Sequence, residues 1–211
     1  DEKVDLGRHF ANKLWNAFRL VQPHLDGFVP DEAKAKGHYT DEDLWIQSMM
    51  ATTVRSVTRN LRAYRIGDAA KDIYDFVWRE LCDWYLEMAK PRLYAEPGTP
   101  DAVAVRTTIQ TVFSHVLRLL HPFMPFMTEE LWHALPGTEG DVAAAEWPAP
   151  ARGSSHPEAE ARIALLKEIV GAVRNLRSEM NVAPARKAAL LIRASESDAT
   201  TRPHQHALIL L

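Results

Sequence analysis

The sequence predicts a mainly α-helical protein, an antiparallel helical bundle followed by a short, truncated α/β tail. Apolar residues recur at spacings of three and four through most of the 211 residues, which is the pattern of helices with one buried face. Turns rich in glycine and proline separate these stretches, so successive helices are expected to reverse direction. The tail is predicted from a change to a strand-like pattern at Lys187 to Ala194.

The first two predicted helices have clear apolar stripes. One runs from about Asp5 to Leu25, and a glycine- and proline-containing loop follows it. The second begins behind Thr40, because a threonine side chain can accept hydrogen bonds from the free N–H groups of a first turn, and it breaks at Gly67. The inward positions of the two helices are Phe10, Leu14, Ala17, Val21 and Leu25, then Ile46, Met50, Val54, Val57, Leu61 and Tyr64.

A third and a fourth helix are predicted on either side of the turn at residues 97–100. The third ends near Pro91, and the fourth continues to His121. Their apolar positions again follow the helical period. They are Ala70, Ile73, Val77, Leu81, Trp84 and Met88 in the third helix, and Val105, Ile109, Val112, Val116 and Leu119 in the fourth.

The fourth helix is expected to end in a proline elbow. Proline has no N–H and pushes the residue before it out of the α region, so Pro122 and Pro125 stop the helix. Thr128 is predicted to cap a short fifth helix that ends at Leu135. The elbow itself is expected to be filled by flexible apolar side chains, those of Phe123, Met124, Phe126 and Met127.

The C-terminal part is expected to differ from the bundle. Residues 136–157 are rich in glycine, alanine and proline and predict a long surface loop. A sixth helix follows, then the strand, then a helical piece from about Thr201; the inward positions of the sixth helix are Ile163, Leu166, Val170, Val173 and Leu176. Because one strand is not stable alone, we interpret residues 157–211 as a final helix with the start of an α/β appendage, and residues 1–156 as the bundle.

Composition excludes several classes of protein. The single cysteine, Cys82, excludes a disulfide framework or a cysteine metal site and fits a reducing cytoplasm. No apolar run approaches the roughly 20 residues that span a bilayer, so no membrane partner is expected. A net charge of −3 argues against a non-specific nucleic-acid binder but leaves room for local basic patches. The chain has no initial methionine, and we interpret it as a fragment, expected to be monomeric.

No catalytic or metal-binding residue is predicted. The sequence contains no glycine-rich phosphate loop, no G-x-S-x-G or H-E-x-x-H motif, and no metal-spaced cluster among its nine histidines. Carboxylate pairs such as Asp83 and Glu87 are typical of a solvated helix face. The sequence therefore favours binding over chemistry.

One candidate binding surface lies on the first predicted helix. At 100° per residue, Arg8, Asn12, Asn16 and Arg19 share a polar face, with Lys13 at its edge. Amides hydrogen-bond base edges, and arginines contact phosphates or stack on bases, so this face suits RNA. An ordinary solvated helix face is the alternative.

Aromatic residues flank the same face. Trp15 and Phe18 are candidate platforms on which bases could stack. Core packing is the alternative, and it is the expected use of most tryptophans in such a bundle.

Two further basic groups are candidates. Arg55, Arg59 and Arg62 fall in one narrow sector of the second helix and could contact phosphates, unless acids of neighbouring helices pair with them: Asp72, Asp75, Glu80 and Asp83. Between Arg174 and Lys187 the segment RNLRSEMN and its flanking residues are densely polar. That cluster could instead tie down the end of the sixth helix through capping bonds.

Five blocks of the sequence together follow a known pattern. They are GRHFANKLWNAFR from Gly7, DLWIQS from Asp43, YDFVWRELCDWYLEMAKPRLY from Tyr74, LHPFMPFMTEELW from Leu120 and VRNLRSEMNVAPARK from Val173. In the same order and roughly the same spacing, these blocks resemble the anticodon-binding domain of class I aminoacyl-tRNA synthetases of the valyl, isoleucyl and leucyl group. The first and last blocks favour the valyl enzymes, although His9 stands where that family usually has asparagine.

The resemblance implies a partner and a missing part. In that family the bundle docks the anticodon stem-loop of a tRNA, here expected to be tRNA-Val, and follows the catalytic domain of the same polypeptide. ATP and Mg²⁺ belong to that domain, and its HIGH and KMSKS signatures are absent here. The fragment is thus expected to need no cofactor and to bind tRNA without aminoacylating it. The alternatives are the same domain of an isoleucyl or leucyl enzyme, or a helical adapter that binds protein.

Overall fold

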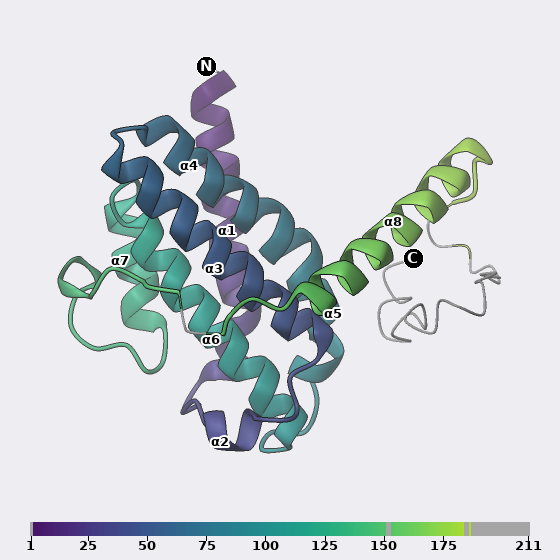
Figure 1. The fold of residues 1–211 in the computed structure, drawn as a ribbon, viewed down its shortest axis with the longest axis horizontal. Coiled ribbons are helices and arrows are strands. Elements are labelled where there is room, and N and C mark those ends of the chain that lie inside the picture. The colour runs from purple at the N-terminus through teal and green to yellow at the C-terminus, as the bar shows by residue number, and fades with distance from the viewer. Residues whose placement is uncertain (1, 151–152, 184–185, 187–211) are drawn as a thin grey trace.

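A computed structural model describes residues 2–150, 153–183 and 186. It shows helices packed as a bundle, with one long helix projecting from its side (Figure 1). The mainly α-helical prediction is confirmed. In chain order the elements are α1 (Glu2–Leu25), α2 (Glu32–Ala35), α3 (Asp41–Arg62), α4 (Ile66–Asp75), the π-helix η1 (Phe76–Tyr85), α5 (Leu86–Leu93), α6 (Pro100–Leu120), α7 (Pro125–Ala134), the 3₁₀-helix η2 (Val142–Ala144) and α8 (Pro157–Glu179).

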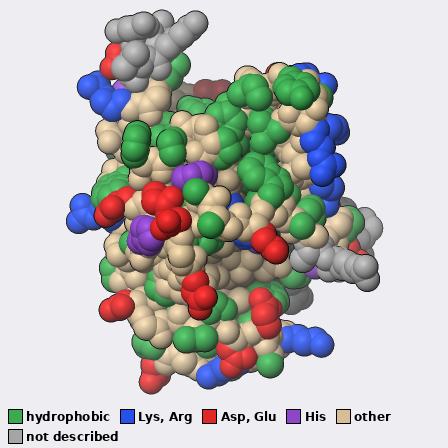
Figure 2. All heavy atoms as spheres, turned by 90° about the vertical axis from the view of Figure 1, so that its left-hand side faces the viewer, with side chains coloured by type: hydrophobic (Ala, Val, Ile, Leu, Met, Phe, Trp, Pro, Cys, Tyr) green, Lys and Arg blue, Asp and Glu red, His purple; other side chains and the backbone are tan. Residues whose placement is uncertain are grey.

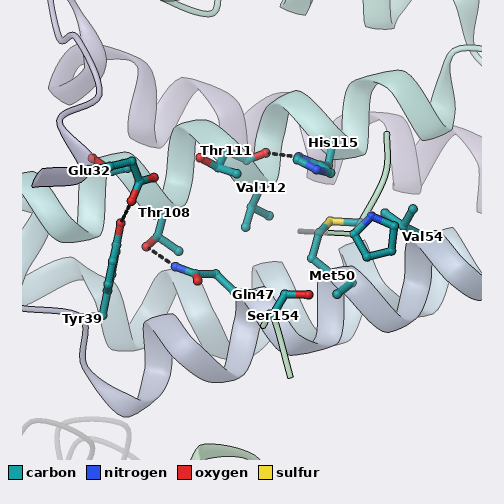
Figure 3. A pocket seen from close by; sticks show the side chains of 13 residues that line it. Glu32, Tyr39, Gln47, Met50, Val54, Thr108, Thr111, Val112, His115 and Ser154 are labelled. Atoms are coloured by element: carbon teal, nitrogen blue, oxygen red, sulfur yellow. Dashed lines mark hydrogen bonds between the residues drawn. The ribbon is translucent and has the colours of Figure 1, made fainter. Parts of the chain in front are cut away.

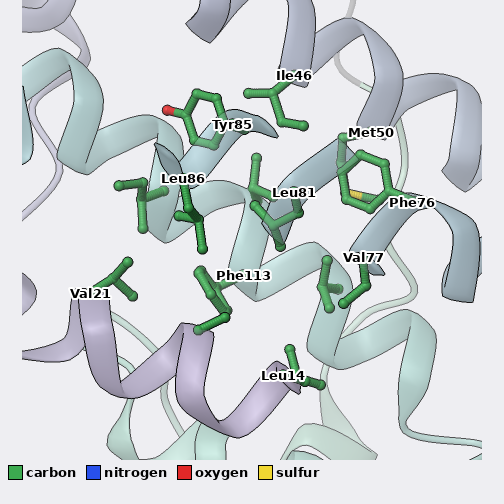
Figure 4. Packing of buried hydrophobic residues seen from close by; sticks show 14 of the residues in the cluster. Leu14, Val21, Ile46, Met50, Phe76, Val77, Leu81, Tyr85, Leu86 and Phe113 are labelled. Carbon is green, nitrogen blue, oxygen red and sulfur yellow. The ribbon is translucent and has the colours of Figure 1, made fainter. Parts of the chain in front are cut away.

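Helix α6 is the centre of the bundle, since α1 to α5 and α7 all pack against it. Its side chains are buried almost throughout, as expected of a helix surrounded by others. Figure 4 shows the core around it, where Val21 of α1, Ile46 of α3 and Leu81 of η1 converge on Phe113 of α6. The stripes of the first two predicted helices thus meet as expected, except at Tyr64.

Tyr64 lies outside the core because α3 ends at Arg62. Its side chain is 90% exposed, and its backbone has a φ of 59°, in the left-handed region that breaks a helix. The start of α3 is as predicted. The Asp43 carboxylate accepts a hydrogen bond from the Thr40 backbone N–H at 3.1 Å, which forms one half of a capping box.

The third predicted helix contains a ten-residue π-helical stretch, η1, between α4 and α5. Its inward side chains, Val77, Leu81 and Tyr85, are spaced by four residues and all buried. In an α-helix a repeated spacing of four drifts around the axis by about 40° per step. In a π-helix the drift has the opposite sign and a similar size, so a spacing of four keeps these residues near the core side in either kind of helix. The sequence pattern predicted a helix here but not its widened turns.

The elbow differs from the prediction in two details. Helix α7 begins at Pro125 rather than behind Thr128, because proline fits the first turn of a helix, where its missing N–H is not needed. The Thr128 hydroxyl therefore donates to the Met124 carbonyl oxygen at 2.9 Å instead of capping. Phe126 does not fill the elbow either: it is 91% exposed.

Helix α8 packs on α3, and its buried positions end at Val170. Ala159, Ile163 and Val170 are buried, whereas Leu176, predicted to face inward, is 55% exposed. The helix runs past the bundle in Figure 1, and in its later turns the Arg174 guanidinium still lies 5.7 Å from the ring centroid of Trp84 in η1. The predicted strand and the last helical piece lie outside the described residues. No helix within the described ranges is long and apolar enough to cross a membrane.

Candidate nucleic-acid interface

The polar face predicted on α1 is present and open. Arg8, Asn12, Asn16 and Arg19 are all exposed, opposite the buried Leu14 of the same helix. Arg8 donates to the Asp5 carboxylate at 3.0 Å, an exposed pair of the kind that contributes little to stability. Within residues 2–150, 153–183 and 186, the side chains of Asn12, Asn16 and Arg19 make no hydrogen bond or ion pair. Two amides and a guanidinium on one face are therefore available to a ligand.

Lys13 is held in place rather than free. Its ammonium group donates to the Asp83 carboxylate at 2.5 Å and lies 3.9 Å from the ring centroid of Trp78. Both partners belong to η1, so Lys13 joins α1 to the π-helix through a salt bridge and a cation–π contact. A phosphate could contact Lys13 only in competition with Asp83.

An aromatic ladder at the border of this face was not predicted. The rings of Phe10 and Tyr74 stack at 5.3 Å, and those of Tyr74 and Trp78 at 5.5 Å. Trp78 is partly buried, next to Lys13. The sequence offers no signal for this arrangement, because the ladder joins α1 to a segment more than sixty positions along the chain and depends on tertiary packing.

The two candidate stacking residues have different surroundings. Trp15 is 38% exposed, beside the polar face of α1. Phe18 is only 2% exposed, and its ring meets that of Phe113 edge to face at 5.6 Å. The prediction that Phe18 stacks on bases is therefore wrong. Four residues after Leu14, it lies only about 40° from the centre of the apolar stripe and belongs to the core.

The arginine row of α3 is also exposed and has no acidic partner among the described residues. Arg55 donates to the Thr52 hydroxyl and Arg59 to the Ser56 hydroxyl, both on α3 itself, and no bond is seen for Arg62. The acids proposed as alternative partners are engaged elsewhere: Asp72 with Ser56 and Asn60, Asp75 with Lys71 and Arg79, Glu80 with Lys167, and Asp83 with Lys13. The three arginines thus form a row of positive charges that no described acidic side chain pairs with.

The α1 face and the arginine row lie on different sides of the bundle. Helix α1 packs on η1, α5, α6 and α7, whereas α3 packs on α4, α6, α8 and η1, so that α6 and η1 lie between them. Figure 2 shows basic side chains gathered along its upper right edge. That edge corresponds to the front of Figure 1, where α3 and α4 lie. A ligand that touched both groups would have to wrap around the bundle.

The polar segment after α8 has a structural role. The Arg177 guanidinium donates to the carbonyl oxygens of Ala183 at 2.9 Å and of Arg186 at 2.7 Å. Asn181 has a φ of 52°, which turns the chain back after the helix. The capping alternative is therefore confirmed for Arg177, while Lys187 lies outside the described residues.

A pocket of about 300 Å³, lined by polar and apolar side chains, lies between α3 and α6 (Figure 3). Gln47 donates to the Thr108 hydroxyl at 3.1 Å, and the Tyr39 hydroxyl donates to Glu32 at 2.6 Å, so much of its polar lining is already satisfied. Burial, with the Arg118 charge acting in the same direction, lowers the pKa of His115, which is therefore neutral at pH 7. Nothing in this lining presents a positive charge to a phosphate.

The cysteine is equally unsuited to chemistry. Cys82 is partly buried in η1, and burial raises the pKa of its thiol to about 12. Because the thiolate is the nucleophile, the group is inert at neutral pH.

The sequence of the chain matches a known protein family. A family model described as the anticodon-binding domain of tRNA ligase matches residues 43–192, more than half of the chain. The chain belongs to this anticodon-binding domain family. Its exposed α1 face lies wholly before the matched segment, so the family model does not cover that face.

Individual relatives cover the α1 face as well. The chain is 38% identical to the valine–tRNA ligase of Carboxydothermus hydrogenoformans over 206 residues, 98% of the chain. It is 39% identical to that of Halalkalibacterium halodurans and 38% identical to that of Bacillus subtilis, each over 204 residues. The chain spans 23% of the length of each of these relatives.

Proposed function

We propose that this anticodon-binding domain is part of a valine–tRNA ligase and that it binds the anticodon stem-loop of tRNA-Val. The observation that carries the proposal is the face of α1, where the Asn12 and Asn16 amides and the Arg19 guanidinium project without partners among the described residues. The valine–tRNA ligases with which the chain shares 38–39% identity support the choice of tRNA. The ATP- and Mg²⁺-dependent aminoacylation would belong to the rest of such a polypeptide.

The geometry suits single-stranded bases better than a duplex. Asn12 and Asn16 are one turn apart, about 6 Å along the helix axis, and each amide offers two donors and one acceptor oxygen. Bases of an RNA loop are unstacked and expose their hydrogen-bonding edges, which is where sequence-specific RNA recognition usually occurs. Arg8 and Arg19, near the two ends of the same face, would then contact the backbone.

The decisive experiment compares binding of the chain to tRNA-Val, to tRNA-Val with an altered anticodon, and to tRNA-Ile, across a salt titration. We expect the tightest binding to tRNA-Val and a loss of at least about tenfold when the anticodon is changed. Equal, steeply salt-dependent binding to all three would reduce the function to general RNA docking. Preference for tRNA-Ile would favour the isoleucyl alternative, and the absence of binding at any salt concentration would favour the protein adapter.

The same titration tests the arginine row of α3. Each phosphate contact changes the slope of log K against log salt by about 0.7–0.9, so Arg55→Ala/Arg59→Ala/Arg62→Ala should make the slope shallower by about 2–3 if all three bind phosphates. Lys71→Ala is the control, because its ammonium group is already paired with Asp75 at 2.5 Å. An unchanged slope in the triple variant would remove the row from the interface.

Trp15→Ala is expected to weaken tRNA binding by about 1–3 kcal/mol, because base stacking on an aromatic ring contributes about that much. Tyr94→Ala is the control: its ring is 56% exposed and meets that of His24, near the far end of α1, edge to face at 4.8 Å. We expect the control to leave affinity unchanged in a filter-binding or fluorescence assay. Equal effects of the two substitutions would show that Trp15 is no stacking platform.

A further inference from the structure

A histidine and two carboxylates meet where α7 ends and the following loop returns to it. The Nε2 atom of His133 lies 3.3 Å from a carboxylate oxygen of Glu129 and 3.5 Å from one of Asp141. All three potential ligand atoms lie within 4.8 Å of one another. Figure 2 looks onto this side of the molecule and shows histidine side chains among acidic ones. We propose that Glu129, His133 and Asp141 bind a divalent transition metal ion of the zinc type.

The spacing of the three groups fits this ion. Zinc binds histidine nitrogen and carboxylate oxygen at about 2.0–2.2 Å with tetrahedral geometry, so two of its ligands lie about 3.3–3.6 Å apart. Both measured distances from His133 fall within that range. With a neutral imidazole the three groups carry two negative charges, which a dication would balance. The mixed nitrogen and oxygen set favours zinc over magnesium or calcium, which prefer oxygen alone.

The loop holds Asp141 in place over the helix. Trp132 donates from Nε1 to the Gly140 carbonyl oxygen at 3.1 Å, and the Thr138 hydroxyl donates to the Trp132 carbonyl oxygen at 2.6 Å. The Val142 N–H donates at 2.9 Å to the same Glu129 oxygen that lies 3.3 Å from His133 Nε2, which orients this ligand; a carboxylate oxygen has two lone pairs, so one remains for an ion. The site is therefore formed before any ion binds, with water expected as the fourth ligand.

Sequence spacing alone could not reveal this site. Glu129 and His133 are four residues apart on one helix, a common surface pair. The third group comes from the loop, and only the folded chain brings it within reach. A plain salt-bridge cluster is the competing explanation, since exposed histidines and acids often meet without a metal.

The test is isothermal titration of the EDTA-treated chain with ZnCl₂, beside the variants His133→Ala, Asp141→Ala and His38→Ala. His38 is the matched control, since it is exposed and lies 3.0 Å from Asp101, the one carboxylate that pairs with it among the described residues. We expect one Zn²⁺ per chain at this site, with affinity unchanged in His38→Ala and weakened by about a hundredfold or more in His133→Ala, because loss of a direct ligand should cost at least as much as the roughly 10–100-fold lost with an outer-shell partner. Zn²⁺ should also raise the melting temperature of the wild-type chain but not that of His133→Ala.

Binding of Co²⁺ reports the coordination geometry of the site. Co²⁺ bound in place of zinc should give the visible absorption of a four-coordinate ion, which Asp141→Ala should abolish. MgCl₂ in excess should not compete. Saturable binding that persists unchanged in His133→Ala would place the ion elsewhere in the chain and overturn the proposal. The absence of saturable Zn²⁺ binding to the wild-type chain would show that the cluster is only a set of ion pairs.

Discussion

Asp43→Ala is expected to lower the free energy of unfolding by about 3–5 kcal/mol, because it removes one partner of a buried ion pair and leaves the other unpaired. The Asp43 side chain is fully buried, and the Arg92 guanidinium donates to it at 2.6 Å with a side-chain exposure of 16%. The same carboxylate accepts from the Tyr85 hydroxyl at 2.8 Å and from the Thr40 N–H at 3.1 Å. One side chain thus ties together the start of α3, the end of η1 and helix α5.

The large expected loss of stability reflects the free energy needed to bury the charged Asp43 carboxylate. Burial raises the pKa of Asp43, and Arg92, Tyr85 and Thr40 act against that rise. The pair itself therefore contributes modestly to the total stability, yet loss of either member exposes the full desolvation cost of the other. Tyr85 would also lose its acceptor in a fully buried position.

Urea unfolding followed by circular dichroism measures this prediction. Asp68→Ala is the control, because Asp68 lies 3.5 Å from Arg65 but is 64% exposed, and such pairs contribute about 1 kcal/mol or less. Similar midpoints for the two variants would mean that the buried network is not what holds α5 against α3.

Local sequence patterns predicted what depends on near neighbours. The capping residue Thr40 and the buried stripe of α1 follow from residues within four positions of one another. The exposed side of α1 follows from the same 100° rotation, which is why Asn12 and Asn16 were placed correctly on the surface. These patterns are short-ranged, and tertiary packing did not override them.

Packing between distant segments decided the errors. Phe18 was judged from its place beside the polar face, but the space next to Phe113 accepts its ring. Leu176 continues the stripe of α8, but α8 has by then passed the first residue of α3, Asp41, which pairs with Arg162. The attachment of Lys13 to Asp83 and Trp78 likewise depends on where η1 lies. No periodicity in a single segment contains that information.

Asn12→Ala/Asn16→Ala is expected to abolish the preference for the tRNA-Val anticodon while leaving the fold intact. A well-made amide contact to a base contributes about 1–3 kcal/mol of discrimination, so the double variant should bind the altered anticodon about as well as the natural one. Alanine is a better helix former than asparagine by about half a kcal/mol. The variant should therefore unfold at the same urea concentration or a slightly higher one.

This combination of results separates recognition from a general loss of binding. Arg8 and Arg19 remain in the variant, so backbone contacts and the salt dependence should be preserved while specificity disappears. Asn175→Ala provides the control, since Asn175 is an exposed asparagine on α8, away from the α1 face. If the double variant still preferred the natural anticodon, the bases would have to be read by other residues, and the open face of α1 would be only a docking surface.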